Sequence, residues 1–91
     1  MRLQFTTDYT ENEMQFLEQN HCKILSEIKL SMTNFSEYDT PRRMFEYCNT
    51  YIGEIFDDEN DQLVWAVLSK YKGVYRWSGM YTDLQSLEQG L

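Results

Sequence analysis

The clearest local signal in this chain is residues 9–14, which have the pattern of a helix start. Thr10 can cap a helix while the Glu13 side chain reaches back to the Thr10 amide, and Tyr9 and Met14 occupy the two positions of a hydrophobic staple. Apolar residues then recur at steps of three and four as far as Ile28, which is the spacing of one helical face. The sequence therefore predicts a first helix over residues 11–32.

Three later segments also show helical spacing. Thr40 and Pro41 suit an N-cap and a first helical position, which predicts a second helix that runs to about Phe56. A third helix is predicted to start near Asp61 and to end at Lys72 and Gly73, and a fourth is predicted over residues 74–88. The favoured fold class is all-α, a small bundle of about four helices.

The second half of the chain leaves an alternative open. Residues 52–56, 63–68 and 74–77 are rich in β-branched and aromatic side chains, and turn-like residues separate them. The alternative fold is α+β, in which two helices are followed by a three-stranded antiparallel meander.

The charge balance restricts the partners. The chain has 91 residues, which fits a single domain over residues 1–91, and its formal net charge is -7. Nucleic-acid phosphates and anionic membranes would both repel such a chain. An acidic surface suits a basic face of another protein, because complementary potentials speed their encounter. The alternative is that the acidity only keeps the protein soluble.

The apolar stretches and the cysteines indicate a cytoplasmic protein. The N-terminal residues lack an apolar core of signal-peptide length, and the longest apolar run, residues 63–68, is far too short for a bilayer span. Cys22 and Cys48 are expected to be free, buried thiols. A Cys22–Cys48 bridge and a metal site that includes His21 are the alternatives.

Signs of catalysis are few. His21 is the only histidine, and it falls on the apolar face of the first predicted helix, so it is interpreted as a packed core residue. The chain has no nucleophile-elbow motif and no glycine-rich phosphate loop. Residues 57–61 are acidic but lack the ligand order of a calcium loop, and they are interpreted as a solvated, helix-capping turn or a contact patch. The sequence predicts a protein that is not an enzyme, with no cofactor and no metal.

Large side chains that are common in protein interfaces crowd the last third of the chain. On this basis the candidate partner-binding residues are Val74, Tyr75, Arg76, Trp77, Met80 and Tyr81, together with the acidic Asp57, Asp58, Glu59 and Asp61. The alternative is that the aromatic residues form the core, with some ordinary exposed rings.

Residues 73–82, which read Gly-Val-Tyr-Arg-Trp-Ser-Gly-Met-Tyr-Thr, resemble the C-terminal helix of the T-even phage anti-sigma factor family of AsiA. The resemblance covers about ten positions, and Gly79 replaces a helix-favouring residue. It implies a small all-helical phage protein that binds the C-terminal domain of the host's primary sigma factor and redirects RNA polymerase. Val74, Tyr75, Arg76, Met80 and Tyr81 would be the carried-over contact residues.

The predicted function is a non-enzymatic inhibitor or regulator, encoded by a phage or mobile element, that occupies a basic surface of a host protein. An anti-sigma factor is its most concrete form. The alternatives are an anti-defence inhibitor of a nuclease, a DNA mimic, a toxin-neutralising immunity protein and, from a different class, a small enzyme or metal protein. A homodimer is also compatible with the sequence.

Overall fold

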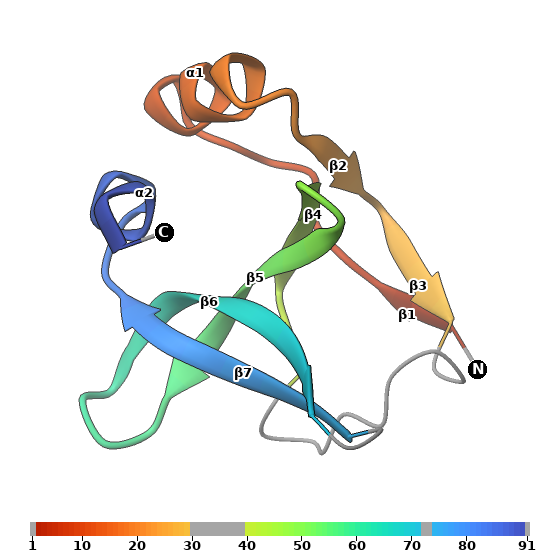
Figure 1. Ribbon diagram of the computed structural model, residues 1–91, viewed down its shortest axis with the longest axis vertical. Coiled ribbons are helices and arrows are strands. Elements are labelled where there is room, and N and C mark those ends of the chain that lie inside the picture. The colour runs from red at the N-terminus through yellow and green to blue at the C-terminus, as the bar shows by residue number, and fades with distance from the viewer. Residues whose placement is uncertain (1, 30–39, 72–73, 91) are drawn as a thin grey trace.

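The computed structural model describes residues 2–29, 40–71 and 74–90, and the fold consists mainly of strands (Figure 1). In chain order the elements are β1 (Arg2–Gln4), α1 (Glu11–Gln19), β2 (Lys23–Leu25), β3 (Glu27–Lys29), β4 (Arg43–Tyr47), β5 (Thr50–Asp57), β6 (Gln62–Tyr71), β7 (Val74–Tyr81) and α2 (Leu84–Gly90). The predicted all-α bundle is therefore wrong, because the described residues form two short helices and two sheets.

All strand pairs in the described residues are antiparallel. The larger sheet has the order β2-β4-β5-β6-β7, and β1 pairs with β3 in a separate two-stranded sheet. Ser26 alone separates β2 from β3, so the chain leaves the larger sheet and joins the smaller one at this residue. Strands β4 to β7 follow one another in sequence and in space, and they form a four-stranded meander.

The larger sheet carries apolar side chains on both of its faces. On the face that we call the helix face, Phe45 and Trp65 pack against both helices. On the opposite face, Met44 and Leu68 pack against Phe5 and Ile28. The core of the helix face consists of Phe16, Leu17, Phe45, Ile52, Trp65, Leu84 and Leu87. Figure 1 shows α1 and α2 near one another on one side of the sheet, with β1 and β3 on the other side of β4.

Helix α1 begins as predicted but ends early. The capping box is confirmed, since the Thr10 hydroxyl accepts a hydrogen bond from the Glu13 amide and the Glu13 carboxylate accepts one from the Thr10 amide. After Gln19 the chain turns sharply at His21, which has a left-handed φ of 55°. The Cys22 amide donates to the Leu17 carbonyl and the His21 amide donates to the Glu18 carbonyl, which is a Schellman termination.

The predicted helix over residues 11–32 is therefore wrong beyond Gln19. Residues 23–25 and 27–29 are strands β2 and β3, and residues 30–32 lie outside the described residues.

The predicted second helix is also wrong, because its residues form β4 and β5. A two-residue turn connects these strands, with φ of 44° at Cys48 and 65° at Asn49. Two consecutive positive φ angles define the type I′ turn, whose twist matches the twist of an antiparallel hairpin. Cys48 takes a conformation here that asparagine or glycine adopts more easily.

The predicted third helix is strand β6, and most of the predicted fourth helix is strand β7. Only the end of the fourth segment is helical, as α2. At the start of α2, the Asp83 carboxylate accepts a hydrogen bond from the Ser86 amide at 2.8 Å. The alternative α+β prediction located the three meander strands at positions that lie within β5, β6 and β7. Of its two preceding helices, the first is present but ends early, at Gln19, and the second is absent because its residues form the β4–β5 hairpin.

Strand β7 contains an irregularity next to the end of the sheet. Trp65 pairs with Tyr81 and Val67 pairs with Ser78, so two residues of β7 lie opposite Ala66. Gly79 is one of the two and has a φ of 73°, which glycine adopts without the strain that a side chain would bring. The bulge places Ser78 and Tyr81 on the helix face.

Candidate functional site

An exposed apolar pair lies at the end of the β5–β6 hairpin. Phe56 and Leu63 are cross-strand partners, and they are 45% and 37% exposed. Each lies two residues along its strand from Glu54 or Trp65, which are also partners and are buried. Because alternate residues of a strand share a face, the Phe56–Leu63 pair extends the helix face beyond its buried part.

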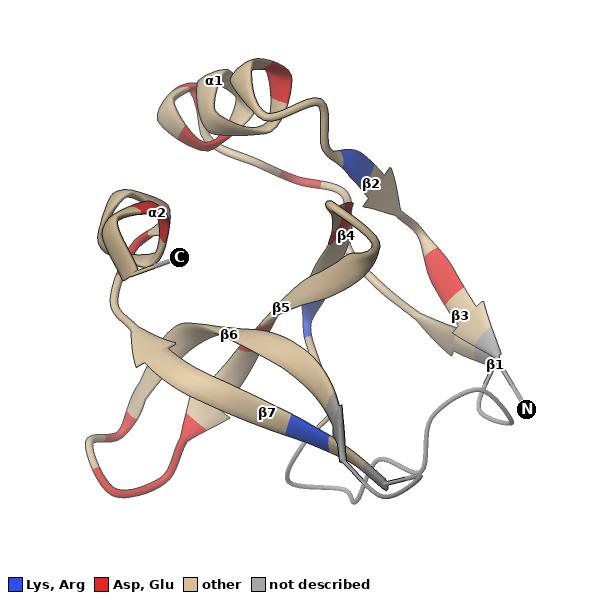
Figure 2. Ribbon diagram, in the orientation of Figure 1, with Lys and Arg blue, Asp and Glu red and all other residues tan. Residues whose placement is uncertain are grey.

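An acidic turn adjoins this pair. Asp57 orders the turn, because its carboxylate accepts the Glu59 amide at 3.1 Å and the Asn60 side-chain amide at 2.8 Å. Asp58, Glu59 and Asp61 are exposed. Figure 2 shows acidic residues along the connection between β5 and β6. The turn caps no helix, contrary to the prediction, since it joins two strands.

Behind the Phe56–Leu63 pair, a partly buried ion cluster centres on Arg43. Its guanidinium bonds the Glu13 carboxylate at 2.7 and 2.9 Å, the Glu54 carboxylate at 2.6 and 3.0 Å, and the Asp8 carbonyl at 2.9 Å. These bonds use all five N–H donors of the arginine. The guanidinium also lies 4.9 Å from the ring centroids of Tyr9 and Trp65. The cluster joins α1 to β4 and β5.

The surroundings of Glu13, Arg43 and Tyr9 shift their pKa values. Burial alone would raise the pKa of Glu13, but hydrogen bonds from Arg43 and Thr10 lower it further than burial raises it. Burial would lower the pKa of Arg43, and its bonds to Glu54 and Glu13 raise it instead. Burial raises the pKa of Tyr9 to about 12, against the effect of the Arg43 charge. Glu13 and Arg43 are thus both charged at neutral pH.

A cavity of about 340 Å³ opens between the two helices, above the Glu54–Trp65 pair. Its lining includes Glu13 and Phe16 from α1, Glu54 and Trp65 from the sheet, and Asp83 beside α2. The cavity has apolar walls and acidic groups, and it lies one step along β5 and β6 from the Phe56–Leu63 pair.

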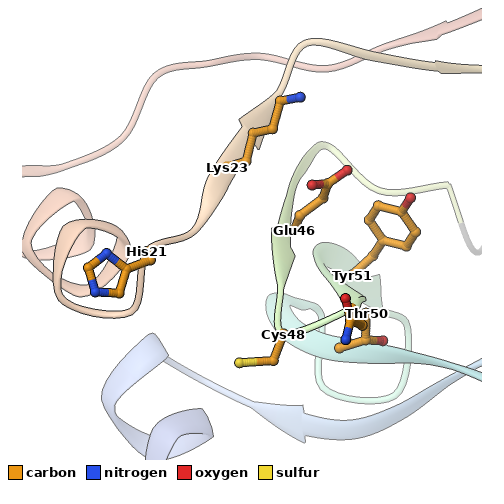
Figure 3. A pocket seen from close by; sticks show the side chains of 7 residues that line it. His21, Lys23, Glu46, Cys48, Thr50 and Tyr51 are labelled. Carbon is orange, nitrogen blue, oxygen red and sulfur yellow. The ribbon is translucent and has the colours of Figure 1, made fainter.

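A second cavity, of about 480 Å³, lies near the β4–β5 turn and is lined by His21, Lys23, Glu46, Cys48, Asn49, Thr50 and Tyr51 (Figure 3). It holds groups that catalyse reactions in other proteins. In Figure 3, however, Glu46 and Tyr51 lie on one side of β4 and the Cys48 thiol points to the other. The side chains do not converge on a common point as a nucleophile and its base must.

The structure corrects two expectations about the titratable residues. His21 is exposed in the turn after α1 and does not pack in the core. The cysteines are free, as predicted, but Cys48 is exposed and Cys22 only partly buried. Burial raises the pKa of Cys22 to about 11, with a smaller contribution from Cys48. Among the described residues, no group of three or more His, Cys, Asp or Glu side chains could hold a metal ion.

The predicted partner-binding residues do not form one surface. Gln62, beside the acidic turn, and Lys70, the partner of Tyr75, are eight residues apart on β6, which is roughly 26 Å. Asp57, Asp58, Glu59 and Asp61 therefore lie far from Tyr75 and Arg76. Tyr75, Trp77 and Tyr81 pack partly against core clusters, whereas Arg76 and Met80 are exposed. The side chain of Val74 lies outside the described part of the structure.

The sequence prediction missed Phe56, Leu63, Arg43 and Glu54. The favoured prediction places Phe56 at the end of the second helix and Leu63 on the apolar side of the third, and the alternative places both in strands. The signal that could have identified them is their place on either side of the acidic turn, because the residues that flank a hairpin loop face each other.

The chain matches no protein-family model, no curated protein and no solved structure. Within the described residues, neither helix has the length and apolar character that crossing a bilayer requires.

Proposed function

We propose that this chain is a non-catalytic protein-binding inhibitor or regulator that acts in the cytoplasm on a partner with a basic surface. The observation that carries the proposal is the exposed Phe56–Leu63 pair at the rim of the acidic turn. Apolar side chains in the centre with charges around them are the usual anatomy of a protein contact. The turn supplies Asp58, Glu59 and Asp61 for the rim.

The distribution of acids supports a specific protein partner over a DNA mimic. Mimicry requires ordered rows of carboxylates at phosphate spacing on one face. In Figure 2 the acidic residues are spread over α1, α2, β3 and the β5–β6 turn. The turn cluster stands beside apolar residues, which a phosphate mimic does not need.

The resemblance to the anti-sigma factor family gives this proposal one concrete partner, a sigma factor. The segment that carries the resemblance is strand β7 here and not a helix, so the helix that the resemblance implied is absent at residues 74–81. The Phe56–Leu63 surface does not depend on that resemblance. An anti-defence inhibitor or an immunity protein would use the same surface.

A capture experiment with surface variants tests the proposal. The wild-type chain, a Phe56→Thr/Leu63→Thr variant and a Met80→Thr variant are immobilised and exposed to bacterial lysate, and retained proteins are identified by mass spectrometry. Met80 is 56% exposed on β7 and serves as the matched control. We expect one protein to be retained by the wild type and the Met80 variant but lost with the double variant.

The identity of the retained protein separates the alternatives. A sigma factor selects the anti-sigma function, a nuclease selects anti-defence, and a toxin selects immunity. Equal retention by all three chains would overturn the proposed surface. Loss of retention with the Met80→Thr variant alone would place the binding surface on β7. Circular dichroism of each variant confirms that the fold is retained.

A further inference from the structure

The cavity between the helices and the Phe56–Leu63 pair form one continuous surface. Ile52, Glu54 and Phe56 alternate along β5, and Leu63, Trp65 and Val67 alternate along β6, so all six share the helix face. The Glu54–Trp65 pair lines the cavity, and the next pair outward is Phe56–Leu63. A chain that covers the exposed pair therefore passes the mouth of the cavity.

The ion cluster at this cavity carries one negative charge in excess. Arg43 contributes one positive charge, whereas Glu13 and Glu54 contribute two negative charges. All five donors of Arg43 already have acceptors within the protein, so the guanidinium has no N–H left for an anion. The carboxylate oxygens, in contrast, have lone pairs for further donors. Asp83, on the opposite side of the cavity, adds a further negative charge.

The burial of these groups makes the excess charge important. Glu54 is only 6% exposed, and the side chains of Glu13 and Arg43 are 16% and 12% exposed. Charges in such surroundings are screened less by salt than exposed ones, and an incoming cation gains more from them. Phe16 and Trp65 provide apolar walls, against which the aliphatic part of a long cationic side chain can pack.

We propose that the cavity receives an arginine or lysine side chain of the basic protein that docks on the Phe56–Leu63 pair. This inference rests on the proposed function. It adds the feature that selects the partner, which is a cationic side chain two residues along the strands from the apolar contact. The cation donates to the Glu13 and Glu54 carboxylates on the side that Arg43 leaves free. An anionic or neutral side chain at that position is rejected.

A titration monitored by amide NMR tests the inference without the partner. The full chain is titrated with N-acetyl-argininamide, N-acetyl-lysinamide and the uncharged N-acetyl-norleucinamide. We expect a cationic compound to shift the Trp65 indole signal and the amide signals of Asn12, Glu13 and Gln85 in a saturable manner, and the norleucine compound to have no such effect. The arginine and lysine arms show which head group fits better.

Two charge variants supply the matched comparison. Glu54→Gln keeps the shape and an acceptor for Arg43 but removes the excess charge, so binding should weaken about tenfold or more, as expected for the loss of a charge-assisted hydrogen bond. Glu18→Gln makes the same side-chain and net-charge change at an exposed position of α1 that does not line the cavity, and it should leave binding in the cavity unchanged.

Several results would overturn the inference. They are an absence of shifts at the cavity, shifts that map to residues 57–61 instead, equal shifts with norleucinamide, and equal weakening by both variants. The set of residues whose NMR signals shift in the wild-type chain decides the question even if Glu54→Gln does not fold. The titration does not involve the Phe56–Leu63 contact. The cavity inference can therefore fail in the titration while the capture experiment succeeds, and the capture experiment can fail while the titration succeeds.

Discussion

Arg43 of β4 and Glu13 of α1 form an ion pair of 2.7 Å, although the two residues are 30 positions apart in the sequence. The same Glu13 carboxylate accepts the Thr10 amide and closes the capping box. One side chain thus starts the first helix and fixes it to the sheet. Because Arg43 also bonds Glu54 of β5, the helix is tied to two strands.

The first prediction concerns this cluster. Replacing Arg43→Met leaves two carboxylates close together without their cation, so the free energy of unfolding should fall by about 3 kcal/mol or more. Urea denaturation measures the change. Arg42→Met removes the same charge from an exposed neighbour, and its effect should stay within about 0.5 kcal/mol. Equal effects of the two substitutions would show that the cluster does not stabilise the fold.

The second prediction concerns pH. The pKa of Glu13 in the folded protein lies below its ordinary value of 4.5, so its contribution to stability is present above that value and is lost as the pH falls through the folded pKa. The difference in unfolding free energy between the wild type and Glu13→Gln should therefore shrink between pH 7 and pH 3. Urea titrations at several pH values measure it. A difference that does not vary with pH would contradict the assigned pKa shift.

The third prediction concerns the two thiols. With a pKa of about 11, roughly one Cys22 side chain in a thousand is a thiolate at pH 8. Cys22 is also less exposed than Cys48. Iodoacetamide should therefore modify the Cys48→Ser variant at least about tenfold more slowly than the Cys22→Ser variant, as followed by intact-protein mass spectrometry. Equal rates, or acceleration of both by urea to the same extent, would mean that Cys22 is not protected by the fold.

The fourth prediction concerns packing at the centre of the sheet. A Cβ atom on Gly53 would lie 2.5 Å from Cη2 of Trp77 and 3.1 Å from Cβ of Pro41. Gly53→Ala should therefore destabilise the protein by about 1–3 kcal/mol. Trp77→Phe removes the nearest ring atoms, so in that background the cost of Gly53→Ala should be smaller. A thermal-unfolding double-mutant cycle measures the coupling, and additive effects would place Trp77 away from Gly53.

The local helix start and the acidic turn could be identified from the sequence alone. The Thr10–Glu13 capping box depends on residues within one helical turn, so no distant part of the chain is needed to specify it. The acidic segment 57–61 is recognised as a turn, but the favoured prediction places helices on either side of it, and only the alternative places strands there. The three apolar segments of the alternative meander coincide with strands because β-branched and aromatic residues favour a pleated surface. This preference is also local to each segment.

The helical spacing in residues 44–55 was misleading because the larger sheet is buried on both faces. Met44 and Phe45 are adjacent and both buried, as are Val64, Trp65 and Ala66. A strand covered on one side alternates between apolar and polar residues, but one covered on both sides does not. Without alternation, positions three and four apart can resemble a helical face by coincidence.

The sequence by itself determined the start of α1, the acidity of the chain and the composition of its strands, because these depend on neighbouring residues. Only the tertiary structure decided that α1 ends at Gln19, that Arg43 meets Glu13 and Glu54, and that Phe56 and Leu63 are left exposed. Those features arise when segments distant in the sequence pack on the two faces of one sheet, and a local pattern carries no information about which segment will cover which face.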